Sequence, residues 1–502
     1  IFSQPEIKNS SAGFYDLNGK FNIKAGNTTV SLSGYYSNDD FKYNNKFGFD
    51  YSTKVAQATV RTLFNDNVTN RLSLVWSDYI SNQNELESQL AARFTTKINY
   101  FRGHNKLSFK IGKMLTDAGV NSTIYNISPG EFNPLSPESV RTPEKLASEK
   151  GIESAAYLSS EIPLTSWLEI LLGVRINHFV SQGPKEIFTY RDGVLSEENI
   201  TGSEIKEGNI KTYLHPELRS SLKINLNSVT SVKVGFGQTS QYLNQIFNTD
   251  VPTPSSQWQI VNHIFEPGLS NNYSAGIFFG SQNNTWEISA EAYLRDLKNI
   301  YDYKDYADLF VNPHIETELL KGIGQSKGIE FSMKKNKGVL NGFVSYTYST
   351  TKYKIDGINK GNWYFANYDQ PHNVSVVLNL QPIEKTTFTA NFTFRSGRPT
   401  TAPVSSYVTF DGVYVPIYSD RNELRIPNTH RLDLSANFGK THNRAAKIKT
   451  SWTFTVYNVY ARKNPFSVFY NRSFKDVPTP QANRLAIIGT IFPSLSFNIE
   501  FE

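Results

Sequence analysis

Apolar and polar residues alternate along segments of about ten to fifteen residues, and such segments recur about nineteen times in the chain. From Leu168 to Ile176, for example, an aliphatic residue occupies every second position, with Glu169 and Arg175 among the residues between them. Successive side chains of a β-strand point to opposite faces, so each segment has one apolar and one polar face. The pattern predicts an all-β fold, a transmembrane antiparallel β-barrel with its apolar face toward lipid and its polar face toward the lumen.

The alternation predicts strands at 14–25, 28–38, 54–64, 67–80, 89–102, 105–116, 151–162, 166–180, 210–225, 228–241, 268–281, 285–303, 322–335, 338–352, 370–381, 385–396, 428–439, 446–462 and 484–501. Turn-forming residues such as Arg102-Gly103-His104 connect every second pair of strands. Long polar loops connect the others, at 117–150, 181–209, 242–267, 304–321, 353–369, 397–427 and 463–483. Barrels place short turns on the periplasmic side and long loops outside, so the loops assign the topology.

The number of predicted strands is odd, whereas single-chain bacterial barrels have an even number. The chain also begins at Ile1 without a signal peptide, although an exported protein must have carried one. We therefore expect that the sequence has lost its beginning, and that residues 1–502 form a single outer-membrane barrel domain without its first strands.

Composition changes this picture little. Hydrophobic residues make up 39% of the chain and the mean hydropathy is −0.41, values expected when a polar lumen and loops dilute the lipid-facing residues. No apolar run reaches the roughly 18 residues of a spanning helix, so a membrane location requires a closed sheet. Aromatic residues make up 14% and gather near segment ends, as in an interfacial girdle. A large soluble all-β protein with an aromatic core is the alternative.

The candidate chemistry does not favour an enzyme. The chain has no cysteine, and its eight histidines form no metal-binding or catalytic motif. His263 is a conceivable ligand but is better explained as an ordinary loop residue. We expect no cofactor and no resident metal. The net charge of +6 is spread along the chain, which does not favour nucleic-acid binding.

If the chain has a ligand site, the geometry of a barrel places it in the external loops above the mouth. Aromatic rings and carboxylates there suit glycans or cationic solutes. The candidate substrate-binding residues are Tyr301, Tyr303, Asp305 and Tyr306 in one loop, and Tyr407, Tyr414 and Tyr418 in another.

Several motifs resemble those of TonB-dependent outer-membrane receptors of the Bacteroidota. The segment from Asn367 to Asn373 is similar to the family's YDRPH(D) strand opening, and 394–399 is similar to its SGRP strand end. The segments 425–435 and 456–466 resemble R-x-P-x-x-H-R-L-D-L-S and VYNVYNRKNPF. The residues that carry the resemblance, to which we assign structural roles, are Asp369, Pro371, His372, Arg395, Gly397, Arg398, Arg431, Asp433, Asn458, Asn464, Pro465 and the near-terminal aromatic Phe501.

The resemblance implies a receptor barrel of 22 strands, as in the family, with an N-terminal plug that binds the energy-coupling TonB complex. About nineteen strands here would match the fourth to the last, and the plug would be absent from this sequence. The expected function is uptake of a scarce or large solute, such as a siderophore, metal chelate, glycan or peptide. The alternative is a scaffolding barrel of a larger outer-membrane assembly or secretion complex. Expected partners are outer-membrane lipids, lipopolysaccharide and surface lipoproteins.

Overall fold

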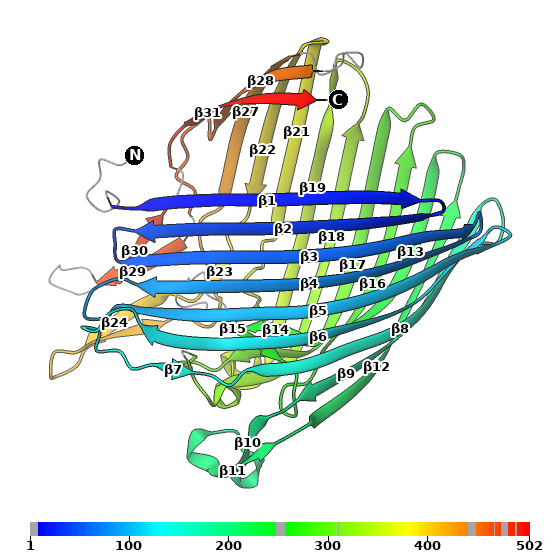
Figure 1. Ribbon diagram of the computed structural model, residues 1–502. Helices are drawn as coiled ribbons and strands as arrows, with labels where there is room; N and C mark the ends of the chain where they lie inside the picture. The colour runs from blue at the N-terminus through cyan, green and yellow to red at the C-terminus, as the bar shows by residue number, and fades with distance from the viewer. Residues whose placement is uncertain are drawn as a thin grey trace.

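One antiparallel sheet curls around a wide interior in the computed structural model (Figure 1). The structure describes residues 9–246, 257–309, 311–439, 448–465, 467–472, 480–486 and 489–501. The sheet has 21 strands, of which β7 and β20 have two residues each, which leaves 19 long strands. The long strands are β1 (Ser11–Ala25), β2 (Thr28–Tyr43), β3 (Phe47–Asn65), β4 (Val68–Glu85), β5 (Ala92–Ile111), β6 (Met114–Pro134), β8 (Glu149–Pro163), β9 (Leu168–Gln182), β12 (Asn209–Asn225), β13 (Thr230–Gln241), β16 (Gly268–Gly280), β17 (Trp286–Tyr303), β18 (Leu319–Lys335), β19 (Leu340–Ile355), β21 (His372–Ile383), β22 (Thr386–Arg395), β27 (Thr429–Gly439), β28 (Ile448–Tyr457) and β31 (Phe492–Phe501).

The remaining elements are short and belong to the loops. They are β7 (Glu144–Lys145), β10 (Lys185–Tyr190), β11 (Ile200–Lys206), β14 (Leu243–Ile246), β15 (Gln257–Ile260), β20 (Tyr364–Phe365), β23 (Pro399–Thr400), β24 (Pro403–Val408), β25 (Tyr414–Tyr418), β26 (Leu424–Arg425), β29 (Ser467–Arg472) and β30 (Pro480–Leu485). Four single-turn 3₁₀ helices accompany them: η1 (Arg191–Gly193), η2 (Glu197–Asn199), η3 (Ile315–Thr317) and η4 (Asn359–Gly361). No helix within the described ranges is long and apolar enough to cross a membrane.

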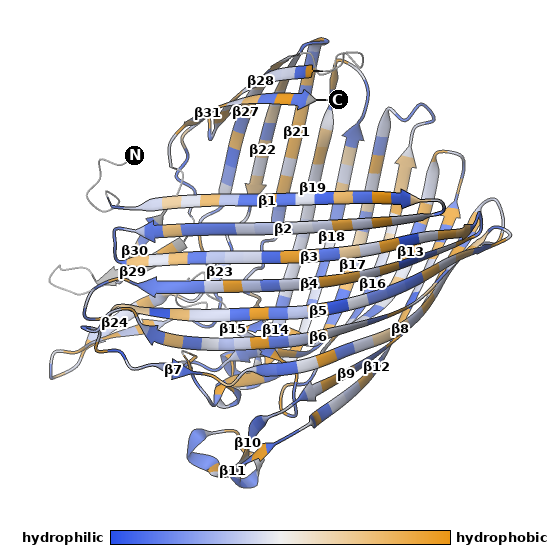
Figure 2. Cartoon of the chain, in the orientation of Figure 1, coloured by the Kyte–Doolittle hydropathy of each residue, from blue (hydrophilic) through white to orange (hydrophobic). Residues whose placement is uncertain are grey.

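The apolar residues of the long strands face outward. Leu172, Val174 and Ile176 of β9 remain about half exposed, whereas Gly173 and Arg175 between them point inward. Similar exposed apolar positions recur around the sheet, and Figure 2 shows the alternation along its strands. So large an apolar surface is not stable in water, which supports the lipid-facing assignment. The predicted antiparallel membrane barrel is confirmed in its architecture.

The assignment of faces predicts different effects for two neighbouring residues. Leu172→Arg would place a charge in lipid and should destabilise the barrel by about 2–4 kcal/mol. Leu171→Arg, one position away on the lumen face, should change stability little. Urea unfolding of both variants in lipid vesicles measures this difference. Equal destabilisation would mean that the two faces are assigned wrongly.

The two ends of the sheet do not pair with each other. Within the described residues, β1 pairs only with β2, and β31 pairs only with β28. The expectation of a closed sheet is therefore not met by these strands alone, although their number, 19, is the odd number predicted. An unpaired strand edge in hydrocarbon leaves backbone groups without hydrogen bonds.

The boundaries predicted between residues 89 and 134 are wrong. The turn expected at Arg102-Gly103-His104 does not exist, because β5 continues through it and Gly103 pairs with Leu74 and Ser122. The actual turn is at Gly112, whose φ of 60° suits glycine. As a result β6 occupies Met114–Pro134, where a loop from 117 onward was predicted.

The predicted strict alternation of short turns and long loops also fails on one side of the barrel. A three-residue turn at 44–46 joins β2 to β3, and residues 86–91 join β4 to β5. Strands β3 to β6 have 18 to 21 residues, more than the roughly ten that cross the membrane. On the outward face of β4, the apolar Trp76 is followed by Asp78, whose carboxylate accepts a hydrogen bond from Asn99. The outward face thus turns from apolar to polar, so these strands continue above the hydrocarbon.

Candidate functional site

The mouth of the barrel is partly filled by a loop that folds back against the inner wall. The hairpin β14–β15 lies between β13 and β16 in the chain. Its Ile260 and the following Val261 are buried against Ile127 of β6 and Phe179 of β9, together with Tyr242. The rings of Phe179 and Tyr242 stack with centroids 4.8 Å apart. The loop is thereby held inside the wall by an apolar contact surface.

A single buried carboxylate adds a polar anchor to the same loop. Glu149, the first residue of β8, is 7% exposed. It accepts hydrogen bonds from the Ile260 backbone N–H at 2.8 Å, the Gln259 side-chain amide at 2.7 Å and the Lys185 ammonium at 2.7 Å. Because Lys185 begins β10, this carboxylate ties the barrel wall to two separate loops.

A second anchor joins three other loops through Arg421, which is 5% exposed. Its guanidinium donates to Asp302 at 3.3 Å, to Asp305 at 2.8 Å and to the Tyr303 carbonyl at 3.1 Å. Tyr364 of β20 donates to the other oxygen of Asp302 at 2.7 Å. The backbone of Arg421 is in turn held by two hydrogen bonds to the side chain of Asn359. The ends of β17 and β25 and the β19–β21 loop therefore form one connected unit.

The seven sequence-predicted binding residues divide between this unit and the exposed rim. The Arg421 guanidinium lies 4.3 Å from the Tyr303 ring centroid, and Tyr303 is only 4% exposed. Asp305 pairs with Arg421, and the Tyr301 hydroxyl accepts a hydrogen bond from the Glu266 N–H. These three residues hold the loops together. The exposed residues on the rim are Tyr306, which is 90% exposed, and Tyr407 and Tyr418 on the β24–β25 hairpin, whereas Tyr414 of the same hairpin is half-buried.

The first group of motif residues stabilises the junction between β19, β21 and β22. Asp369, nearly fully buried, accepts the Thr351 N–H at 2.6 Å and pairs with Arg425. Gly397 donates to Asn428, and a Cβ on it would collide with the Ile426 carbonyl, which explains the glycine. Two other residues of this group accept hydrogen bonds through their carbonyls: Pro371 from the Ser349 N–H and Arg398 from the Ile426 N–H. His372 faces outward and bonds the Tyr346 hydroxyl at 2.9 Å. Arg395 is exposed.

The second group lies where β27 and β28 meet the last external loop. Arg431 pairs with Asp433 at 2.9 Å, and Asp433 accepts the Asn458 N–H at 2.9 Å. Asn458 is fully buried with φ of 53°, and its side chain bonds both the N–H and the carbonyl of Arg462. The side chain of Asn464 likewise bonds both the N–H and the carbonyl of His430, and Pro465 beside it is buried. Phe501 pairs through its backbone with Ile448. Where the structure describes them, these residues contact other residues of the chain, and their structural role stays a prediction.

The sequence analysis missed the two main anchors. Glu149 fell at the edge of a predicted loop, and Arg421 was one of many loop arginines. Neither has a local signal, because the nearest of their partners in sequence is 36 residues away and most are more than 100 residues away. The predicted loop residues 247–256 and 473–479 lie outside the described residues. Across the residues that the structure does describe, no three His, Cys, Asp or Glu side chains are arranged to hold a metal ion.

His263, which follows β15, predicts a pH dependence. Burial, followed by the charges of Lys185, Lys206 and Lys211, lowers its pKa to about 4, and neither ring nitrogen has a hydrogen-bond partner. Unfolded, the imidazole takes up a proton near pH 6.5, whereas in the fold it stays neutral until about pH 4. Stability of the loop is therefore full above the unfolded pKa and is lost as pH falls through this window. Hydrogen exchange of 257–267 should accelerate from pH 7 to 4.5 beyond the intrinsic change, and His263→Phe should remove the excess.

Comparison with known proteins agrees with this architecture. Residues 4–459 match the family described as "TonB dependent receptor-like, beta-barrel". Solved structures with similar folds include the ferric-catecholate import receptor Fiu from E. coli K12 (13% identity, 99% of this chain and 76% of that chain, TM-score 0.64). Others are the ferric preacinetobactin receptor BauA from Acinetobacter baumannii (13%, 99% and 73%, 0.63) and the ferric yersiniabactin uptake receptor FyuA from Yersinia pestis (12%, 98% and 71%, 0.64). No curated protein sequence matches the chain significantly.

The chain is a β-barrel of the bacterial outer membrane with a polar interior and loops folded over its mouth. It belongs to the TonB-dependent receptor-like β-barrel family.

Proposed function

We propose that this barrel takes up a scarce or large solute across the outer membrane, with a metal chelate, glycan or peptide as the cargo. The observation that carries the proposal is the structure of the mouth. Its loops are anchored by Glu149 and Arg421, while the side chains of Tyr306, Tyr407 and Tyr418 remain exposed at the rim. Anchored loops with exposed rings suit capture of a dilute solute better than free diffusion through an open pore.

Similar structures give the proposal its cargo class. One of them is named as a ferric-catecholate import receptor, another as a ferric yersiniabactin uptake receptor, and a third as the ferric preacinetobactin receptor. We infer that uptake is driven by the TonB complex through a plug carried by a longer form of this protein. We also infer that further strands join the unpaired edges of β1 and β31, because a backbone edge in hydrocarbon is unfavourable.

The test uses cells that express the full-length protein and a ferric catecholate as the probe. Replacing Tyr306, Tyr407 and Tyr418 with alanine should weaken binding of the ferric catecholate about tenfold or more. Stacking of a planar ring on an aromatic side chain contributes about 1–3 kcal/mol per contact. The same positions changed to phenylalanine keep the rings and serve as the matched control. Unchanged uptake in the alanine variant would remove the rim from the proposed site. Stable co-purification of other outer-membrane subunits without any uptake would favour a scaffolding barrel instead.

A further inference from the structure

The outer wall of the barrel becomes basic where strands β17, β18 and β19 leave the hydrocarbon. On β18, Phe331 and Ile329 face outward and are exposed, and the next outward residue toward the external end is Lys327. Trp286 and Lys335 lie at the other end of this apolar band, beside the short turns, with the ammonium group 5.6 Å from the ring centroid. The strand covers about 27 Å between the two lysines, which at the tilt of such barrels spans most of their roughly 25 Å apolar band. Lys327 therefore lies at the level of the outer-leaflet headgroups.

Three further lysines share the outward face in the two rows of residues above Lys327. In the upper row, Ile323 of β18 is 46% exposed and pairs with Lys298 of β17 on one side and with Lys354 of β19 on the other. Neighbouring strands are about 4.8 Å apart, so the backbones of these two lysines are about 10 Å apart. Lys352 of β19 lies in the row between. We call Lys298, Lys327, Lys352 and Lys354 the outer lysine cluster.

The outer lysine cluster has no counter-charge within the part of the chain that the structure describes. None of its four ammonium groups forms an ion pair or a hydrogen bond there, although that of Lys352 lies 4.7 Å from the centroid of the Phe365 ring. Asp296 is the one carboxylate among the outward residues of the same rows, and it accepts a hydrogen bond from Gln325 at 3.1 Å. The cluster therefore presents a net positive charge to its surroundings.

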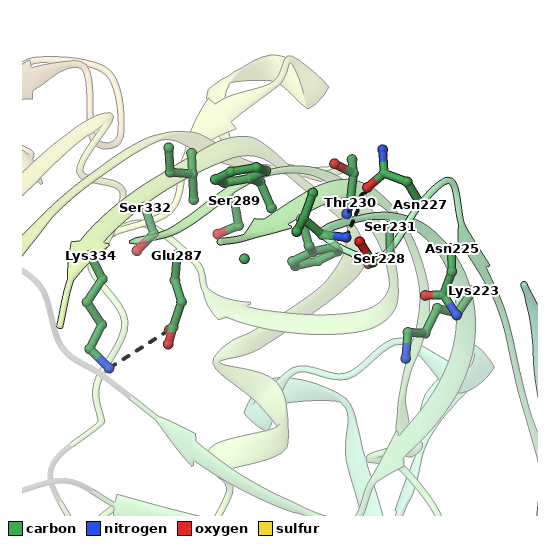
Figure 3. Close-up of a pocket in the computed structure, with 15 residues that line it drawn as sticks. Lys223, Asn225, Asn227, Ser228, Thr230, Ser231, Glu287, Ser289, Ser332 and Lys334 are labelled. Carbon is green, nitrogen blue, oxygen red and sulfur yellow. Dashed lines mark hydrogen bonds and ion pairs between the residues drawn. The ribbon is translucent and has the colours of Figure 1, made fainter. Parts of the chain in front are cut away.

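Two lysines elsewhere in the sheet show the contrast. Lys334, at the periplasmic end of β18, pairs with Glu287 at 3.9 Å (Figure 3). On the opposite wall, Lys54 of β3 is the direct cross-strand neighbour of Asp78, in the first polar row above Trp76. Unbalanced lysines are thus not a general property of the level at which the wall leaves the hydrocarbon. They are particular to the outward face of β17, β18 and β19.

We propose that the outer lysine cluster binds the phosphorylated headgroup of an outer-leaflet lipid. Lysine ammonium groups bind phosphate oxygens as compact point charges. Their alkyl stems can lie along Ile323 while the charged ends reach the headgroup. The acyl chains of the same lipid would lie against Ile329 and Phe331 below. Tyr348 and Tyr346, which pair with these two residues, border the site on β19, as rings do at a membrane interface.

Position decides between a lipid and the other partners that a basic surface attracts. A soluble anion or an acidic protein would be attracted by the lysines alone. A lipid contacts both the lysines and the apolar band directly below them, and basic residues at a membrane surface bind anionic headgroups in this way. The inference needs only the outer-membrane location of the barrel. It does not depend on the cargo proposed above.

The test uses the full-length protein, extracted from outer membranes in a mild detergent and freed of bound lipid. Native mass spectrometry then measures the binding of added phosphatidylglycerol. Each lysine beside an anionic lipid contributes about a fivefold gain in affinity, so Lys298→Gln/Lys354→Gln should bind about thirtyfold more weakly than the unmodified protein. Equal affinity of the two proteins overturns the proposal.

Two further variants separate charge from structure. Lys54→Gln/Lys97→Gln removes the same charge from exposed outward positions of the opposite wall and should leave the affinity unchanged. Lys298→Arg/Lys354→Arg keeps the positive charge and should retain binding. A loss in the opposite-wall variant as large as in Lys298→Gln/Lys354→Gln would mean that the lipid has no particular site. An equal loss in the arginine variant would mean that charge is not what binds it, and either result overturns the proposal.

Two other probes identify the occupant. A diacylglycerol with the same acyl chains lacks the phosphate and should bind the unmodified protein at least about tenfold more weakly. Inorganic phosphate, at the same concentration as the phosphatidylglycerol, should not displace it. Displacement would indicate a site for a free anion, and equally tight binding of the diacylglycerol would indicate an apolar contact alone. Either result overturns the lipid headgroup as the occupant.

Discussion

Arg421→Met is expected to disconnect the external loops that meet at the end of β17. The substitution keeps most of the side-chain volume but leaves Asp302 and Asp305 without their cation and the Tyr303 carbonyl without a donor. Breaking a buried ion pair by removing one partner costs about 3–5 kcal/mol. Because these contacts hold loops and not the barrel wall, we expect the lost stability to appear as more frequent local opening of the loops. The transmembrane strands should stay folded.

Hydrogen exchange resolved by segment measures this effect. Exchange should accelerate more than about a hundredfold in residues 301–309, 355–369 and 419–425 and remain unchanged in β3 to β6. Lys321→Met is the control, because the Lys321–Glu266 pair lies at the surface with both side chains nearly half exposed. A surface pair contributes about 0–1 kcal/mol. Similar exchange in both variants would contradict the assignment of Arg421 as an anchor.

Glu149→Gln is expected to release the β14–β15 hairpin from the inner wall. The amide that replaces the carboxylate keeps only one acceptor oxygen, so its N–H₂ group faces at least one of the three donors, from Ile260, Gln259 and Lys185, and the side chain no longer neutralises the lysine. The cost of leaving a buried charge unpaired is about 3–5 kcal/mol. The apolar contacts of Ile260 and Val261 would remain, so the loop should open more often without unfolding the barrel.

The absence of cysteine allows a direct measurement. A single Val261→Cys change introduces the only thiol of the chain at a position with no solvent exposure. A bulky maleimide should react with it slowly, and about a hundredfold faster when Glu149→Gln is added. Glu131→Gln is the control, since its partner Lys145 is largely exposed to solvent. Fast labelling in the single Val261→Cys variant would show that the loop is open without any change at Glu149.

Much of the fold was predictable because each membrane-crossing strand carries its own period-two pattern. The strand at 168–176 is readable from nine residues, and its faces are as predicted. The pattern fails above the membrane, where both faces of a strand are polar. The continuation of β2 and β3 past residues 38 and 54 has polar residues such as Asp50 on its outward face, so it reads as loop. Gly103 was misread as a turn because a glycine between Arg102 and His104 is typical of turns. In the structure it occupies a lipid-facing strand position opposite Leu74.

The site was predictable only in part. Local motifs singled out Asp369, Asp433 and Asn458, which are buried and bonded to residues in other recognisable segments, while the structural role assigned to them stays a prediction. Composition identified an aromatic loop at 301–306 but could not separate Tyr303, buried under Arg421, from Tyr306 at the surface. That separation depends on a contact across 118 positions of the chain.

The unequal rim of the barrel has a mechanical consequence. From β2 to β6 the outer rim is a continuous hydrogen-bonded ladder closed by connections as short as residues 44–46, and bending it would break several backbone bonds at once. From β8 onward the rim consists of folded loops held by a few side-chain anchors. Any movement that opens the mouth to admit a solute must therefore occur in the loops that follow β8, while the long strands β2 to β6 stay fixed. Cargo would then enter over β8 and the strands that follow it, on the side of the barrel that carries the folded loops.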